Sequence, residues 1–124
     1  MLHSRQIIAF VPTKHVNEAR AFYKEVLGLR FVSEDSFALV FDTNGTMLRV
    51  SVVPDFKPHP FTILGWQVPN IQEAVSDLHA KGVTFEHFGF TEQDVQGIWS
   101  APGGAKVAWF KDPDGSVLSL TQLA

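Results

Sequence analysis

The sequence predicts an α+β domain in which one β-α-β-β-β module occurs twice in tandem. Two observations support this prediction: matching segments recur in both halves, and each half shows strand-like and helix-like patterns in the same order. The matching segments are 11–12 with 68–69 (Val-Pro), 18–19 with 73–74 (Glu-Ala), 28 with 82 (Gly), and 44–51 with 114–121. Each candidate site residue in one half therefore identifies a counterpart in the other half.

Length and composition indicate one globular domain over residues 1–124, with modules at about 1–54 and 61–124. Hydrophobic residues make up 45% of the chain, which is enough for a core. The net charge of −3 and the lack of a long apolar run argue against nucleic-acid and membrane partners. No cysteine is present, which excludes disulfides and Cys-ligated zinc. We expect a cytoplasmic protein, because the first residues do not resemble a signal peptide.

The first half reads as a strand, a helix and three further strands. Apolar residues at helical spacing, Ala19, Phe22, Tyr23 and Val26, predict a helix over 17–26. The Asn44-Gly45 pair predicts a tight hairpin between the last two strands. The predicted strands are 6–11, which Pro12 and Thr13 would end, and then 29–34, 37–42 and 46–53.

The second half repeats this order. A helix is predicted over 71–81, where Ile71, Ala74, Val75 and Leu78 share one face. The segment Asp112–Gly115 (Asp-Pro-Asp-Gly) predicts a turn between the last two strands. The predicted strands are 63–68, 83–88, 106–111 and 116–123.

The two halves differ mainly in one inserted segment. The offset between matching residues rises from 54 at Phe31 and Phe85 to 70 at Asn44 and Asp114, so the second half carries 16 extra residues between about 88 and 105. This segment is aromatic and bounded by glycines, which is typical of a lid or an interface loop. The alternative is a surface excursion whose Trp99 only packs down.

The helix sequence at 17–29 (NEARAFYKEVLGL) and the hairpin sequence at 110–120 (FKDPDGSVLSL) resemble the vicinal oxygen chelate superfamily. This group includes glyoxalase I, bleomycin-resistance proteins and extradiol dioxygenases. The resemblance implies two βαβββ modules that form an open, curved, eight-stranded mixed sheet, a half-barrel with the helices outside. It also implies a concave ligand cavity and a homodimer. Neither motif carries chemistry, so the resemblance does not specify a reaction.

Metal-using members of that superfamily hold the ion with residues on the first and fourth strands of each module. The corresponding positions here are Gln6, Arg49, Ile63 and Ser119. Isoleucine offers no ligand atom, serine is a weak neutral ligand, and arginine would repel the ion. With one plausible ligand in four, we expect no metal and no other cofactor.

The same positions predict which side chains line the cavity, because residues two apart on a strand share a face. The expected ligand-binding residues are Gln6, Phe10, Arg49, Ser51, Gln67, Trp99, Trp109 and Ser119. By the same reasoning Leu39 should point inward like Trp109, whereas Trp66 should face a helix. The predicted lining is mostly apolar with a few polar groups, as in small-molecule pockets.

Arg49 has two interpretations. Its guanidinium could bind the carboxylate or phosphate of a ligand, because it offers paired donors. It could instead form an internal ion pair with Asp42 or Glu34, or lie exposed if the strand register is shifted.

These observations favour a metal-independent protein that binds a planar, apolar or anionic small molecule. The alternative is a glyoxalase-like lyase or isomerase, or a dioxygenase-type enzyme, with no metal or with an unconventional site that uses Gln6 and His87. A third possibility is a structural or regulatory module whose own aromatic side chains fill the cavity. No two carboxylates or imidazoles converge on the predicted cavity, which argues modestly against catalysis.

Overall fold

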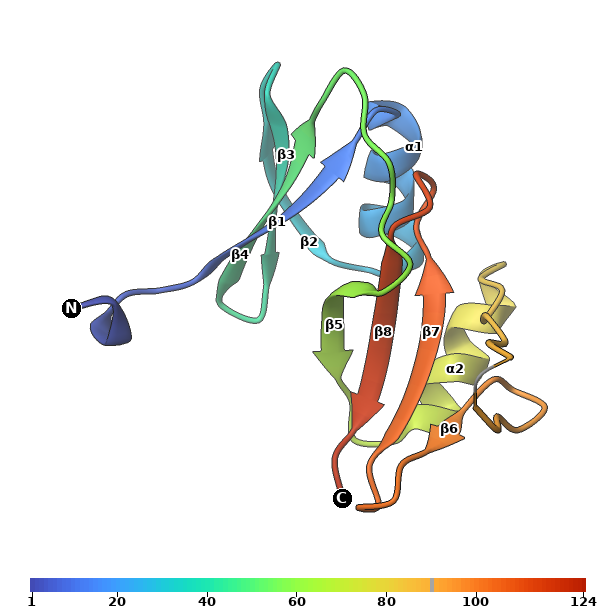
Figure 1. Ribbon diagram of the computed structural model, residues 1–124. Helices are drawn as coiled ribbons and strands as arrows, with labels where there is room; N and C mark the ends of the chain where they lie inside the picture. Colours follow the sequence, from blue (N-terminus) through green and yellow to red (C-terminus); the bar gives the residue numbers. More distant parts are fainter. Residues whose placement is uncertain (90) are drawn as a thin grey trace. The chain divides into compact units, whose positions relative to one another are not determined.

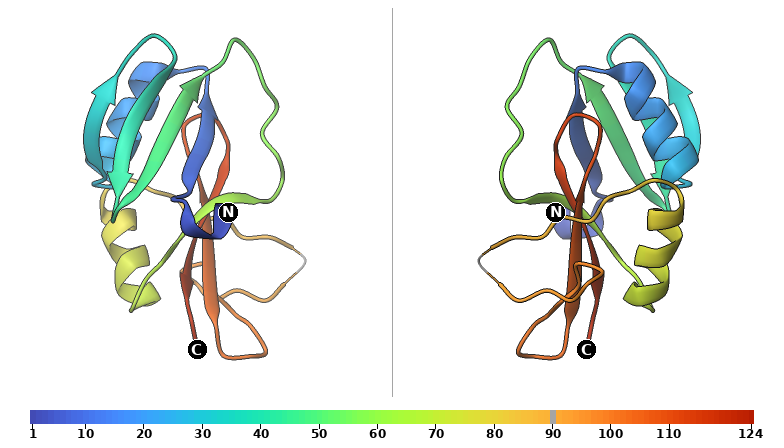
Figure 2. Two further views of the ribbon diagram at one scale, coloured as in Figure 1. Left: turned by 90° about the vertical axis from the view of Figure 1, so that its left-hand side faces the viewer. Right: turned by 90° about the vertical axis from the view of Figure 1, so that its right-hand side faces the viewer.

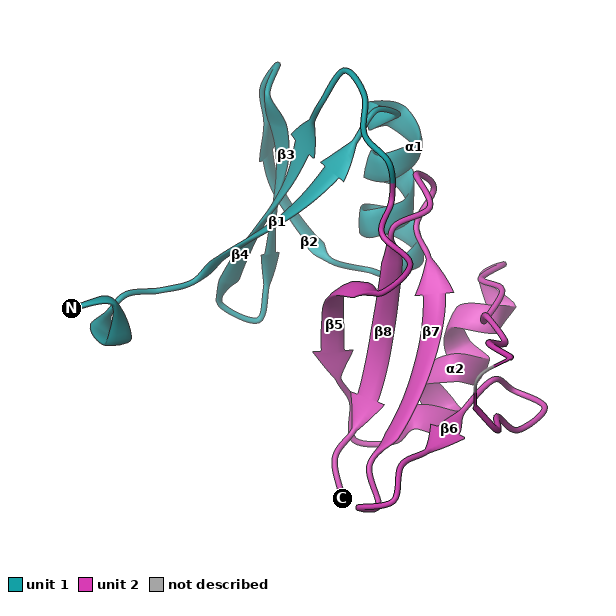
Figure 3. Ribbon diagram, viewed as in Figure 1, with its two compact units in different colours: residues 1–57 teal, residues 58–124 magenta. Residues whose placement is uncertain are grey.

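The computed structural model describes residues 1–89 and 91–124, which form two compact units, Met1–Lys57 and Pro58–Ala124 (Figure 3). Phe90, part of the predicted insertion, lies outside the described residues. Each unit contains one four-stranded mixed sheet and one main helix (Figure 1). The predicted α+β class and the repeated βαβββ module are confirmed. The eight strands hydrogen-bond as two sheets of four, one within each unit, and not as one continuous ladder.

Unit 1 has the strand order β1-β4-β3-β2, with β1 parallel to β4 and the other pairs antiparallel. Its helix α1 continues into a π-helical turn, and together they cover the helix predicted at 17–26. Figure 2 shows this helical segment against one face of the sheet. The elements are a short 3-10 turn (Leu2–Ser4), β1 (Ile8–Thr13), α1 (Val16–Ala21) with its π-helical continuation (Phe22–Val26), β2 (Arg30–Glu34), β3 (Ala38–Thr43) and β4 (Thr46–Val52).

The core of unit 1 lies between the helix and one face of the sheet. Tyr23 from the helix is fully buried, and its ring lies 6.0 Å from that of Phe41 on β3. Leu48 and Val50 on β4 are also fully buried on this face. Alternation then directs Arg49, which lies between them, to the opposite face of the sheet.

Unit 2 repeats this arrangement with the order β5-β8-β7-β6. Asn70 caps α2, because its side chain accepts a hydrogen bond from the Glu73 N–H at 3.1 Å. Phe110 on β7 is fully buried on the face that α2 covers, with Phe85 beside it. The elements are β5 (Thr62–Gln67), α2 (Ile71–Ala80), β6 (Trp99–Ser100), β7 (Lys106–Lys111) and β8 (Val117–Gln122).

The first strand differs from its prediction. It begins at Ile8 and continues through Pro12 to Thr13, so Gln6 lies outside it. Pro12 does not end the strand, because β1 is at the edge of its sheet and pairs only with β4. An edge position tolerates a residue without an N–H.

The predicted strand 83–88 is wrong as an extended element. Its pairing with β7 consists of one β-bridge, between Phe85 and Phe110, and a backbone hydrogen bond that the Glu86 N–H donates to the Trp109 carbonyl oxygen at 2.8 Å. The fourth strand of the second sheet is instead β6, which lies within the insertion and pairs with Val107 and Lys106 of β7. The edge of β7 therefore pairs with β6 from the inserted segment, and residues 83–88 pair with β7 through one bridge.

The predicted inward position of Leu39 is also wrong. Leu39 pairs with Val50 and is fully buried on the helix-covered face, whereas Trp109 pairs with Ser119 on the other face. The counterpart of Trp109 is Val40, which pairs with Arg49. The longer turn of the second hairpin shifts the pairing by one residue, and one residue reverses the face.

Candidate functional site

The open face of the second sheet, the side away from α2, carries the main candidate site. Ser119 on the central strand β8 pairs with Trp109 on β7 and with Gly65 on β5, so these three residues share this face. Gln67 and Thr121 form the next pair along the same face. Trp66 pairs with Leu120 and lies on the helix-covered side, as the strand parity predicts.

Three aromatic side chains cluster on this open face, and we call them the aromatic cluster. The rings of Trp99 and Trp109 are nearly parallel, with an interplanar angle of 28° and centroids 6.1 Å apart. Phe88 meets Trp109 edge-on at 5.4 Å. Both tryptophans are partly exposed, so part of their ring surface is accessible to a ligand.

Phe88 was not among the predicted site residues. It falls at the end of the predicted strand 83–88, and strand periodicity carries no information on its contacts. The concentration of aromatic residues in the insertion was the signal that could have identified it. Two of the three members of the aromatic cluster, Phe88 and Trp99, come from this inserted segment.

Ser119 and Gly65 lie beside the aromatic cluster, and we call this closely packed pair with its serine hydroxyl the polar floor. A Cβ atom at position 65 would lie 2.7 Å from Ser119 Oγ and 3.2 Å from the Ser119 carbonyl oxygen. Only glycine allows this approach between β5 and β8. The Ser119 side chain consequently lies directly over the β5 backbone, and it is 6% exposed.

Gln93 holds the inserted segment in place. Its amide oxygen accepts a hydrogen bond from the Phe88 N–H at 2.6 Å. Its amide nitrogen donates to the carbonyl oxygens of Glu86, at 2.9 Å, and Gly97, at 2.6 Å. These three bonds link both ends of a loop and fix the backbone from which Phe88 projects.

The open face of the first sheet carries the other candidate group, Arg49. Arg49 lies on β4 with Phe10 on one side and Val40 on the other. Ser51, two residues further along, pairs with Pro12 and Ala38 on the same face. Phe10 is 59% exposed, so this face presents an aromatic ring next to a cation.

The carboxylates considered as internal partners of Arg49 are paired elsewhere. Glu34 binds Arg20 through two hydrogen bonds, the shorter at 2.6 Å, and Asp42 lies 3.6 Å from Arg30. Arg49 has no hydrogen bond or ion pair with any residue in 1–89 or 91–124. The proposed ion pairs with Asp42 and Glu34 are therefore not formed.

The Asp35 carboxylate interacts electrostatically with Arg49. Backbone N–H groups of Phe37 and Ala38 donate to its side chain at 2.7 and 2.9 Å and lower its pKa. Desolvation opposes this shift, and the charge of Arg49 adds a smaller lowering of the same pKa. Asp35 is thus engaged mainly with its own turn, and the guanidinium keeps its donors available.

The side chains at the four positions aligned with metal ligands are chemically unsuited to a divalent metal. Gln6 is exposed and precedes β1, and Ile63 lies at a β-bulge in β5. Throughout residues 1–89 and 91–124, no three His, Asp or Glu side chains gather closely enough to hold a metal. A divalent metal does not fit this set of side chains, because one is cationic and one is aliphatic.

Residues 6–120 match the family model described as the Glyoxalase/Bleomycin resistance protein/Dioxygenase superfamily. The chain belongs to this superfamily. The match covers both units and agrees with the repeated module seen in the structure. A search of curated protein sequences found no match.

Solved structures of this superfamily share the fold. A bleomycin resistance determinant encoded on transposon Tn5 is 21% identical, with a TM-score of 0.74 and coverage of 97% of this chain and 98% of the other. A bleomycin-binding protein complexed with bleomycin is 21% identical, with a TM-score of 0.73 and coverage of 98% and 100%. Lactoylglutathione lyase from Agrobacterium tumefaciens is 17% identical, with a TM-score of 0.71 and coverage of 96% and 93%.

At these identities the similarity establishes the fold of this superfamily member and does not assign a ligand. Both binding proteins and a lyase are represented among structures of this shape. No helix in the described part of the chain is long and apolar enough to cross a membrane. The side chains on the open faces of the two sheets are the candidates for ligand binding.

Proposed function

We propose that this protein binds a small molecule without a metal, and that the aromatic cluster of unit 2 holds a planar, apolar part of it. The observation that carries the proposal is the nearly parallel pair Trp99 and Trp109, with Phe88 edge-on. Large, partly exposed rings beside a polar floor are typical of pockets that hold flat ligands. Ser119 and Gln67 supply hydrogen-bonding groups on the same face.

We propose further that Arg49 recognises an anionic group. Its guanidinium is flanked by Phe10 and Val40 and is unpaired among the residues that the structure describes. A guanidinium next to apolar surface binds carboxylate or phosphate oxygens through paired hydrogen bonds. We also expect a homodimer, since Ile8, Phe10 and Met47 on this face are exposed apolar residues.

Calorimetric titration of metal-free protein tests the proposal. Bleomycin is one probe, because a structural neighbour was solved in complex with it. Naphthalene-2-carboxylate is a second probe, with 2-naphthamide as its uncharged counterpart. We expect saturable binding of at least the planar carboxylate in the presence of a chelator. No saturable binding of either bleomycin or the carboxylate would contradict the proposal.

Replacing Arg49 with alanine should weaken binding of benzoate, a probe small enough to contact Arg49 and Phe10 of unit 1 alone, by about tenfold, because a charged hydrogen bond contributes roughly 1.5–3 kcal/mol. Binding of benzamide should change little. Arg20→Ala is the matched control, since it removes a guanidinium that pairs with Glu34 on the helix-covered side. Equal losses for the acid and the amide would show that Arg49 does not recognise the charge.

The metal-dependent form of the enzymatic alternative predicts a bound metal, so elemental analysis of untagged protein tests that form. The unconventional metal site considered for such an enzyme uses Gln6 and His87. His87 lies in a pocket beside α2, away from the aromatic cluster, and Gln6 is an exposed residue that precedes β1. We expect metal content far below one ion per chain. A stoichiometric transition metal that is lost in Gln6→Ala would establish the alternative.

A further inference from the structure

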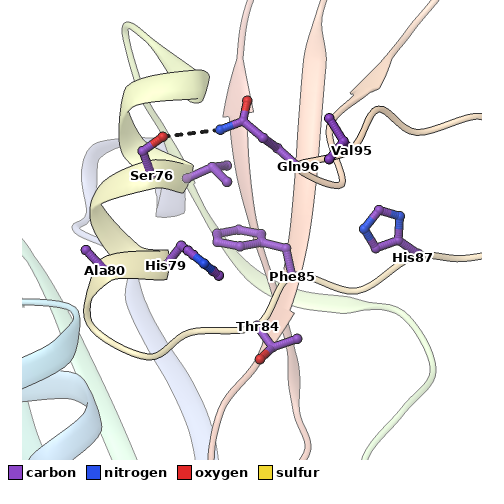
Figure 4. Close-up of a pocket in the computed structure, with 9 residues that line it drawn as sticks. Ser76, His79, Ala80, Thr84, Phe85, His87, Val95 and Gln96 are labelled. Carbon is purple, nitrogen blue, oxygen red and sulfur yellow. Dashed lines mark hydrogen bonds between the residues drawn. The ribbon is translucent and has the colours of Figure 1, made fainter.

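A pocket lies on the helix-covered side of the sheet of unit 2, between α2 and the loop residues of 84–89 and 91–97. Its volume is about 510 Å³, within the range of small-molecule sites. Figure 4 shows its walls: the helix supplies Ser76 and His79, and the loop supplies His87, Val95 and Gln96, with Phe85 between them. This pocket is separate from the aromatic cluster, because Phe85 packs with Phe110 on the helix-covered side of the sheet.

The insertion builds this pocket. Gln96 donates a hydrogen bond to the Ser76 hydroxyl at 3.2 Å and so joins the loop to the helix (Figure 4). Gly97 has φ of +92°, and a Cβ there would lie 3.3 Å from Phe85 Cβ and 3.6 Å from His87 Nε2. Glycine thus brings the loop close to the base of the pocket and next to the His87 imidazole.

The lining selects a particular chemical class. Its apolar part comes from Val75 and Phe85, which are buried, and from Val95, which is 94% exposed at the rim. Its ionisable groups are two imidazoles, His79 and His87, and among the described residues that line it there is no carboxylate or lysine. The imidazoles lie on opposite sides of Phe85 in Figure 4. Imidazole N–H groups donate to anions, and a protonated ring adds a favourable charge.

We propose that this pocket is a second binding site, for a small carboxylic acid with an aromatic body. The aromatic ring of the ligand packs between Phe85 and Val95, and its carboxylate accepts a hydrogen bond from the imidazole of His79 or His87. The absence of acidic side chains in the lining favours an anion over a cation. This site would be independent of the binding proposed for the open faces of the sheets.

Two-dimensional ¹H–¹⁵N NMR of labelled protein, titrated with phenylacetate, tests the proposal. We expect saturable shifts concentrated at Ser76, His79 and 95–97, with 2-phenylacetamide binding about fivefold or more weakly. His79→Ala and His87→Ala should each weaken phenylacetate binding by a similar factor. Ala80→Phe narrows the pocket from an exposed helix position and should abolish the shifts. His59→Ala, in the same unit but outside the pocket, is the control and should have no effect.

The outcomes are distinguishable. Shifts that do not saturate, that spread over the surface, or that persist unchanged in Ala80→Phe would overturn the proposal. Equal binding of acid and amide would also overturn it, since charge recognition would then be absent. The pocket variants should leave calorimetric binding of 2-naphthamide at the aromatic cluster unaltered, because this probe has no carboxylate for the imidazoles to bind. Failure of the second site is therefore separable from failure of the proposed function.

Discussion

Replacing Trp109 with alanine is expected to weaken binding of a planar ligand about 30-fold, or about 2 kcal/mol, which combines lost ring burial and lost stacking. Trp109 contacts both other members of the aromatic cluster, Phe88 and Trp99. Removing it therefore eliminates the central ring and leaves the other two without a common neighbour. Calorimetric titration with naphthalene-2-carboxylate measures the effect.

Two variants sharpen this test. Trp109→Phe keeps a ring on the open face and should recover much of the affinity. Trp66→Phe removes an indole of the same sheet from the helix-covered face and should bind as the parent protein does. If Trp66→Phe weakened binding as much as Trp109→Ala, the effect would come from general loss of structure. The aromatic cluster would then not be the binding surface.

Replacing Phe110 with alanine should lower the free energy of unfolding by about 3–5 kcal/mol, as for other buried phenylalanines. Phe110 is fully buried, packs against Phe85 at a ring distance of 5.4 Å, and lies next to Trp109 on the same strand. Urea unfolding followed by circular dichroism measures the loss. Phe110→Leu keeps most of the volume and should cost considerably less.

The comparison between these neighbours is informative because they are adjacent aromatic residues on one strand that occupy opposite faces of the sheet. Trp109→Ala should change binding much more than stability, and Phe110→Ala should do the reverse. A loss of stability below about 1 kcal/mol for Phe110→Ala would contradict its place in the core. Such a result would also call into question the strand register that directs Trp109 to the open face.

Much of the fold could be predicted because its signals are local. The apolar spacing in 71–81 and the turn residues at Asn44-Gly45 and 112–115 indicate elements that the structure confirms. Strand parity also placed Trp66 and Trp109 on opposite faces, as the structure shows. The prediction failed at Leu39, because a difference of one residue between the hairpins reverses the face and residue spacing alone does not determine the pairing.

The candidate site was predicted less completely. Arg49, Ser119 and Trp109 lie on open sheet faces as expected, whereas Gln6 lies outside β1. Phe88 was missed because its position depends on the three hydrogen bonds of Gln93, which join residues from 86 to 97. Such side-chain bonds across an irregular loop leave no periodic pattern in a sequence.

The sequence by itself determined the duplicated module, the superfamily resemblance and the side chains at the four aligned ligand positions. These follow from residue identity and short-range spacing, which a single chain displays directly. The tertiary structure alone decided that β6 within the insertion becomes the fourth strand of the second sheet. It also decided that Glu34 pairs with Arg20 and Asp42 with Arg30, so neither acid pairs with Arg49. The folded insertion further lines a pocket beside α2. Each of these features depends on which of several groups, distant in the sequence, pairs with a given strand edge or side chain. Only the folded chain determines that choice.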